Sequence, residues 1–155
     1  MSSDSGKQHE MQRALLSVIQ SLQDSQKGFA DIGEHLKDET LKRYFFAESL
    51  KRASFRGDLE EALHQSGMHD INEHGTATGT LHRVWGDLKA KLGGGDHGLL
   101  ETAETSEDEA KKAYSNALNH ELPLPVRELL AEQQAHVLAS HDYVRDQRDA
   151  LAGQK

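Results

Sequence analysis

The chain contains no cysteine, which excludes disulfides, thiolate metal sites and cysteine nucleophiles. Aromatic residues make up only 5% of the 155 residues, and only 2 are proline. No segment approaches the ~20 consecutive apolar residues that a membrane-spanning helix needs. The first ten residues lack the apolar stretch of a secretory signal. We therefore expect a single cytoplasmic domain of ordinary size without a membrane partner.

Positive charge is also scarce, because 18 Lys and Arg residues stand against 26 Asp and Glu, for a net charge of -8. An acidic surface repels phosphate groups, so we expect no nucleic acid as a main partner. The sequence also lacks the nucleophile-elbow motif of serine hydrolases and the glycine-rich motifs that bind phosphates or dinucleotides. No catalytic residue and no reaction can be assigned from the sequence, and whether the protein is an enzyme stays open.

Helical periodicity is the dominant pattern in the chain. Apolar residues recur every three or four positions, which indicates helices with one buried face. We predict one domain over residues 9–151, preceded by a mobile segment at residues 1–8. Its helices are expected at residues 9–36, 39–65, 76–92, 97–119 and 125–151.

Short connections near Lys37 and Leu122 predict two antiparallel helical hairpins. The shorter helix at 76–92 lies between them and can carry the chain back along the bundle. We therefore predict an all-α, ferritin-like four-helix bundle with a crossover helix. Asp38 and Asp96 are expected to cap the helices that follow them. Leftover apolar surface on such an acidic bundle favours a homodimer.

Several positions on the apolar stripes carry polar side chains instead. They are Ser25, Glu48, Arg52, Glu104, Glu107, Gln133 and His141. At ~1.5 Å of rise per residue, most of them fall at a similar depth in the bundle, with Gln133 deeper. Burying an unpaired carboxylate costs several kcal/mol, so these residues need partners. Two interpretations follow.

The first interpretation is a metal-binding or redox protein with a degenerate carboxylate and histidine site in the bundle core, using iron, manganese or zinc, because these ions accept carboxylate and imidazole ligands. The candidate ligands are Glu48, Glu104, Glu107 and His141, with Glu34, Glu101, Gln133 and His136 as a second group. Dinuclear iron bundles use a Glu-x-x-His motif on each of two helices. The only such motif here is Glu61–His64, which is far from the layer, so a complete dinuclear ligand set is not present.

The second interpretation is a hydrogen-bonded polar layer that fixes the helix register. Glu48 and Arg52 are four residues apart on one helix and can form an ion pair. Under this interpretation the protein is a non-enzymatic, stress-related or interaction protein.

Two neighbouring features are interpreted as parts of ordinary helix surface. The acidic residues from Glu104 to Glu109 are expected to form mainly a solvated helix face. His141 and Asp142 are adjacent, and adjacent helical residues point about 100° apart, so we do not expect these two side chains to face each other.

Some longer segments are distinctive. They are Gly79–Lys89, which contains Leu81-His82-Arg83-Val84-Trp85, then Glu101-x-x-Glu104-x-x-Glu107, and His141-Asp142-x-x-Arg145. Together they resemble an uncharacterised bacterial family of ferritin-like four-helix-bundle proteins that contain a domain of unknown function. The resemblance covers about residues 12–150 and implies a ferritin-like fold. It brings no reaction, substrate or cofactor. The positions that match are Glu34, Glu101, Glu104, Glu107, Gln133 and His141.

Overall fold

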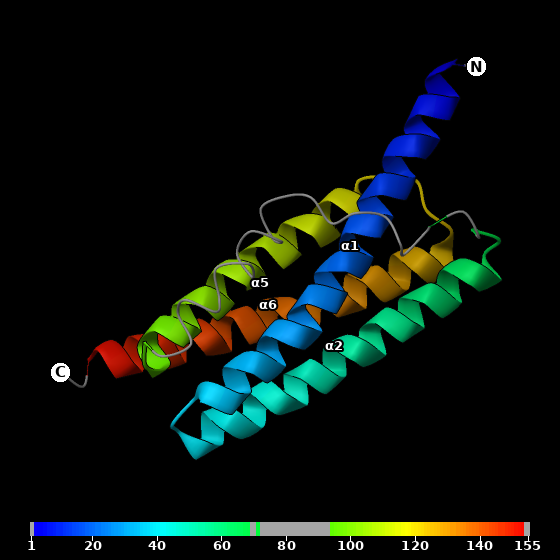
Figure 1. Ribbon diagram of the computed structural model, residues 1–155. Helices are drawn as coiled ribbons and strands as arrows, with labels where there is room; N and C mark the ends of the chain where they lie inside the picture. The colour runs from blue at the N-terminus through cyan, green and yellow to red at the C-terminus, as the bar shows by residue number, and fades with distance from the viewer. Residues whose placement is uncertain (1, 69–70, 72–93, 154–155) are drawn as a thin grey trace.

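The computed structural model describes residues 2–68, 71 and 94–153. Over these residues the chain forms four packed α-helices and no strand (Figure 1). The helices are α1 (Ser2–His35), α2 (Glu39–Gln65), α5 (Asp96–Leu118) and α6 (Leu124–Ala152). The predicted all-α four-helix bundle is therefore confirmed. The helix predicted at residues 76–92 lies outside the described residues.

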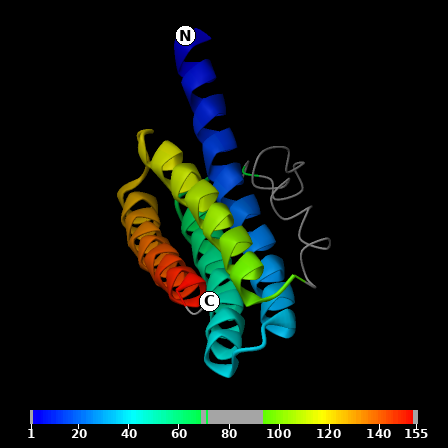
Figure 2. The same cartoon turned by 90° about the vertical axis from the view of Figure 1, so that its left-hand side faces the viewer.

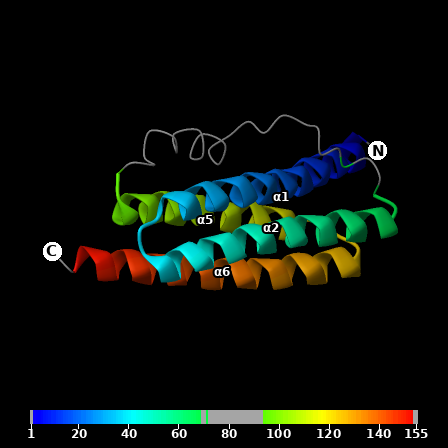
Figure 3. The same ribbon diagram turned by 60° about the horizontal axis from the view of Figure 1, so that its bottom comes forward.

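The four helices form two antiparallel hairpins whose turns lie at opposite ends of the bundle (Figures 1 and 3). One hairpin joins α1 to α2 and the other joins α5 to α6. α1 packs beside α5, and α2 packs beside α6. Each helix therefore runs antiparallel to both of its neighbours. The two short connections in the sequence predict this arrangement within each hairpin.

Of the two helix caps predicted from the sequence, one is confirmed and one is wrong. Asp38 caps α2 as predicted, because its carboxylate accepts a hydrogen bond from the Leu41 amide at 2.9 Å. The prediction for Asp96 is wrong, since Gly95 occupies the cap position of α5 and makes no side-chain cap bond. The Asp96 carboxylate instead accepts from the amides of Lys37 (2.8 Å) and Asp38 (3.1 Å). These two amides lie in the first hairpin turn and have no acceptor within their own helix. By accepting from both, Asp96 connects the start of α5 to that turn.

The first helix begins at Ser2 rather than at the predicted residue 9. Residues 6–10 are exposed, and Figure 2 shows that the first turns of α1 project beyond the other helices. An apolar stripe marks where a helix is packed. The helix itself continues beyond its packed part, since each added residue gains a backbone hydrogen bond once the helix has formed.

The interior consists of two apolar clusters with a polar layer between them. The larger cluster includes Leu15, Val18, Leu22, Leu59 and Leu130, and the smaller one includes Phe29, Ile32, Phe45, Leu100 and Val144. The buried polar residues between them are Ser25, Glu48, Ser49, Arg52, Ser106 and Glu107. Burial of the apolar residues supplies the main favourable free energy of folding.

Two tyrosines, the buried Tyr114 and the half-buried Tyr44, should couple the stability of the bundle to alkaline pH. Burial raises the pKa of Tyr44 and of Tyr114 above the ordinary value of about 10. A raised pKa in the folded state stabilises the fold fully below about pH 10, and this contribution is lost as the pH rises further. In an alkaline titration, tyrosinate absorbance from these two residues should therefore appear together with the loss of helical circular dichroism. Full tyrosinate absorbance in a still-helical protein would contradict this expectation.

Candidate metal centre

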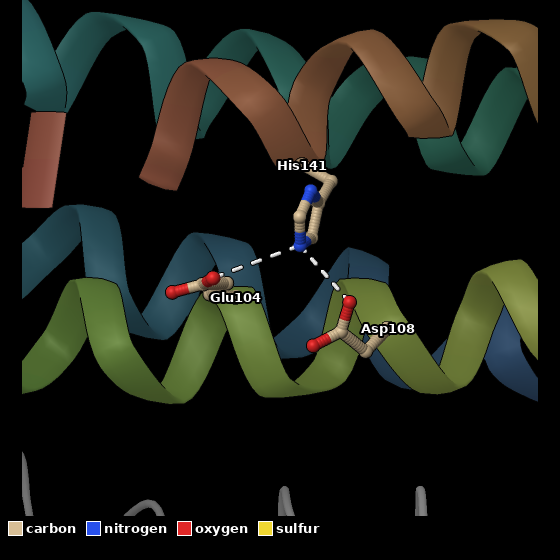
Figure 4. Close-up of side chains that lie close together, drawn as sticks. All are labelled: Glu104, Asp108 and His141. Carbon is tan, nitrogen blue, oxygen red and sulfur yellow. Dashed lines mark ion pairs between the residues drawn. The ribbon is translucent and has the colours of Figure 1, made fainter. Parts of the chain in front are cut away.

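Three potential metal ligands meet between α5 and α6. Glu104 and Asp108 lie four residues apart on α5, and His141 reaches toward them from α6 (Figure 4). The His141 Nε2 atom lies 2.9 Å from Asp108 Oδ1 and 3.7 Å from Glu104 Oε1. One ligand atom of each residue lies within 4.8 Å of the others. Two oxygen atoms and one imidazole nitrogen could therefore bind one ion.

The cluster lies at the edge of the bundle because of the helix geometry. Residues four apart share one face of a helix, so both carboxylates of α5 face the antiparallel helix α6. The side chains of His141 and Glu104 are only 9% and 14% exposed, whereas that of Asp108 is 47% exposed. The cluster is therefore shielded on the core side and open to solvent on the side of Asp108.

The second ring nitrogen of His141 also faces a carboxylate. The Nδ1 atom lies 3.0 Å from Asp142 Oδ1, and this hydrogen bond is the main cause that lowers the pKa of the Asp142 carboxyl. The prediction that these neighbours do not face each other is therefore wrong. The angle of about 100° separates the points where side chains leave the helix, and rotation about the side-chain bonds brings the two polar atoms together.

The surroundings of His141 favour a positive charge at its Nε2 atom. A neutral imidazole carries one N–H, and its other nitrogen is an acceptor. Because both ring nitrogens of His141 face carboxylate oxygens, a neutral ring would turn one lone pair toward a negative charge. A proton or a metal ion at Nε2 relieves this conflict. Arg148 binds the Oε2 atom of Glu104, which leaves Oε1 facing the imidazole.

A family model described as "Domain of unknown function (DUF2383)" matches residues 10–120. The chain belongs to this family. The domain-of-unknown-function part of the predicted resemblance is thereby confirmed. The DUF2383 match runs through most of α1 and all of α2 and α5, so it contains both carboxylates of the cluster, while His141 follows it. No curated protein matches the chain.

No described helix of this DUF2383 protein is long and apolar enough to cross a lipid bilayer. This finding concerns only residues 2–68, 71 and 94–153.

The four candidate ligands predicted from the sequence divide into two groups. Glu104 and His141 meet in the cluster, whereas Glu48 and Glu107 face Arg52. Arg52 donates two hydrogen bonds to Glu107, both at 2.7 Å, and lies 3.3 Å from Glu48. The predicted ion pair between Glu48 and Arg52 is confirmed. Glu48 and Glu107 are thus occupied by an internal cation and lie apart from the cluster.

The second group of candidates also lies outside the cluster. Glu34 and Glu101 are exposed. Gln133 accepts a hydrogen bond from a buried tyrosine hydroxyl and donates one to a backbone carbonyl of α2. His136 faces Glu48, with 2.8 Å between Nε2 and the nearer carboxylate oxygen. The buried Gln133 and the half-buried His136 therefore already have partners in the DUF2383 fold.

Asp108 is the candidate ligand that the sequence did not indicate, because it belongs to an acidic run interpreted as a solvated helix face. Its side chain is indeed half exposed, so burial gives no signal. The useful signal was its spacing of four residues from Glu104, which places both carboxylates on one helix face. Only the packing of α6 shows that this face meets a histidine.

The polar layer around Arg52 has the properties of a structural network. Burial by itself lowers the pKa of Arg52, but the charge of Glu107 and its hydrogen bonds more than offset this effect and hold the pKa above its ordinary value. The guanidinium also lies over the Phe29 ring, 4.9 Å from its centroid. Arg52 therefore stays charged, and the carboxylates beside it act as its counter-ions.

Proposed function

We propose that the protein binds one divalent transition-metal ion, zinc, manganese or iron, through Glu104 Oε1, Asp108 Oδ1 and His141 Nε2. The observation that carries this proposal is the position of Nε2, which lies within 2.9 and 3.7 Å of two carboxylates. Two oxygens and one nitrogen are ligands that these ions accept. Compared with the ligands expected from the sequence, Glu104 and His141 remain, and Asp108 replaces Glu48 and Glu107.

Charge and access both support metal binding at this place. Asp108 and Glu104 both bring negative charge to the cluster, and Arg148, which pairs with the far oxygen of Glu104, leaves the near oxygen facing the imidazole. Three protein ligands leave coordination positions for water on the exposed side of Asp108. The role we propose is metal binding, and it includes no reaction. The hairpin connectivity supports the ferritin-like assignment made from the sequence.

Metal binding is tested by equilibrium dialysis of chelator-treated protein against Zn²⁺, Mn²⁺ or anaerobic Fe²⁺, followed by elemental analysis. We expect the wild-type protein to take up about one equivalent, because preformed ligands bind tightly. His141→Ala and Glu104→Gln should each lose this uptake. His136→Ala and Glu101→Gln are matched controls on the same two helices and should retain it. Absence of uptake by the wild-type protein, or equal uptake by His141→Ala, would refute the proposal.

The homodimer expected from the sequence stays a prediction, and α2 offers a place for it. Phe46 and Leu50 lie one helical turn apart and are 39% and 73% exposed. If they form the contact, Leu50→Glu should yield a monomer, while Leu124→Glu, at a leucine of α6 that is 64% exposed, should leave the dimer intact. Light scattering distinguishes these outcomes. A monomer mass for the wild-type protein at micromolar concentration would disprove the dimer.

A further inference from the structure

We infer that Asp142 is a positioning residue of the metal centre, which makes His141 bind the ion through Nε2 and not through Nδ1. This inference rests on the proposed function. Asp142 is not one of the three clustered ligands. It acts on the opposite side of the imidazole ring, through its hydrogen bond with Nδ1 at 3.0 Å.

The geometry places the two ring nitrogens in different surroundings. Figure 4 shows Nε2 directed toward Glu104 and Asp108, while the other nitrogen lies on the side of the α6 backbone. The carboxylate that meets Nδ1 is itself held by Arg145, whose Nη1 lies 3.5 Å from Asp142 Oδ1. A chain of contacts thus runs from Arg145 through Asp142 to the imidazole.

The hydrogen bond decides which nitrogen has a free lone pair. A carboxylate can only accept a hydrogen bond, so in the bond between His141 and Asp142 the proton lies on Nδ1. In a neutral ring this leaves the lone pair on Nε2, directed into the cluster. Carboxylates in this arrangement fix the tautomer and the orientation of metal-binding histidines in general. Without Asp142, the ring could rotate or adopt the tautomer with a proton on Nε2, which does not bind a metal through that atom.

The test compares Asp142→Ala, Asp142→Asn and Asp146→Asn with the wild-type protein. Zn²⁺ affinity is measured by competition with a chelating dye, and the His141 ring nitrogens are observed by NMR in histidine-labelled protein. We expect Asp142→Ala to weaken Zn²⁺ binding by about ten- to a hundredfold. Asp142→Asn should recover most of the affinity, because the amide oxygen can accept the same hydrogen bond. Asp146 is also paired with Arg145, so Asp146→Asn removes the same charge close to the same arginine. This variant should bind Zn²⁺ as the wild-type protein does.

The ring signals provide a readout that a merely structural role would not change. Zn²⁺ should be attached to Nε2 in the wild-type protein, and a hydrogen-bonded Nδ1 proton should be lost in Asp142→Ala. Wild-type affinity and ring signals in Asp142→Ala would overturn the inference, and so would an equal loss in Asp146→Asn. If the wild-type protein binds no metal, the proposed function fails. The positioning role has a separate test in the metal-free protein: an Nδ1 proton signal that Asp142→Ala does not change would overturn it.

Discussion

Replacement of Glu107 by leucine should lower the free energy of unfolding by about 3–5 kcal/mol, because it leaves a buried arginine without its main counter-ion. Arg52 is 0% exposed, and each of its two terminal nitrogens donates a hydrogen bond to Glu107. Arginine stays protonated in proteins, so Arg52 cannot lose its charge when Glu107 is removed. Glu48 remains 3.3 Å away and compensates for part of the loss. Urea denaturation followed by circular dichroism measures the difference.

The double variant Arg52→Met/Glu107→Leu separates the loss of a partner from the loss of packing. Replacing a whole buried ion pair by apolar residues is often neutral or stabilising, so this variant should be much more stable than Glu107→Leu alone. Glu48 keeps its contact with His136 at 2.8 Å in both variants. Glu101→Leu, at an exposed position of the same helix, should change stability by no more than about 0.5 kcal/mol. A similarly small effect of Glu107→Leu would show that the buried pair does not organise the core.

Metal binding should raise the stability of the wild-type protein strongly. A ligand that binds only the folded state at 100 times its dissociation constant adds about 2.7 kcal/mol to the free energy of unfolding. For a chain of this length, such a gain corresponds to a rise of roughly 5–10 °C in Tm. Differential scanning calorimetry with increasing Zn²⁺ measures the rise, and a chelator should reverse it. The His141→Ala variant should show no rise.

The control for this experiment is His136→Ala, which removes a histidine of the same helix that faces Glu48. Its Tm should rise with Zn²⁺ as the wild-type Tm does. The chain contains 10 histidines, so adventitious binding elsewhere is the alternative to test. An equal rise in His141→Ala and the wild-type protein would assign the stabilising ion to other histidines.

The depth of a residue along its helix could be predicted, whereas its direction could not. A rise of ~1.5 Å per residue placed Glu104 and Glu107 within one turn of each other. They nevertheless serve different partners, since Glu107 reaches the central Arg52 and Glu104 faces His141 and Arg148 on α6. Three helical residues make less than a full turn, so two such side chains point in different directions. Which neighbour each of them meets depends on the rotation of the packed helices.

Local spacing in the chain was therefore sufficient to predict the four described helices, the two hairpins and the ion pair of Glu48 with Arg52. Each of these depends on residues that are close together in sequence. Contacts between α5 and α6 required the folded structure. Asp108 and His141 are far apart in the chain, and nothing in the pattern of either helix specifies the angle at which it packs. That angle results from the burial of both apolar faces at once, and it brings two acidic side chains from one helix against a histidine of the other.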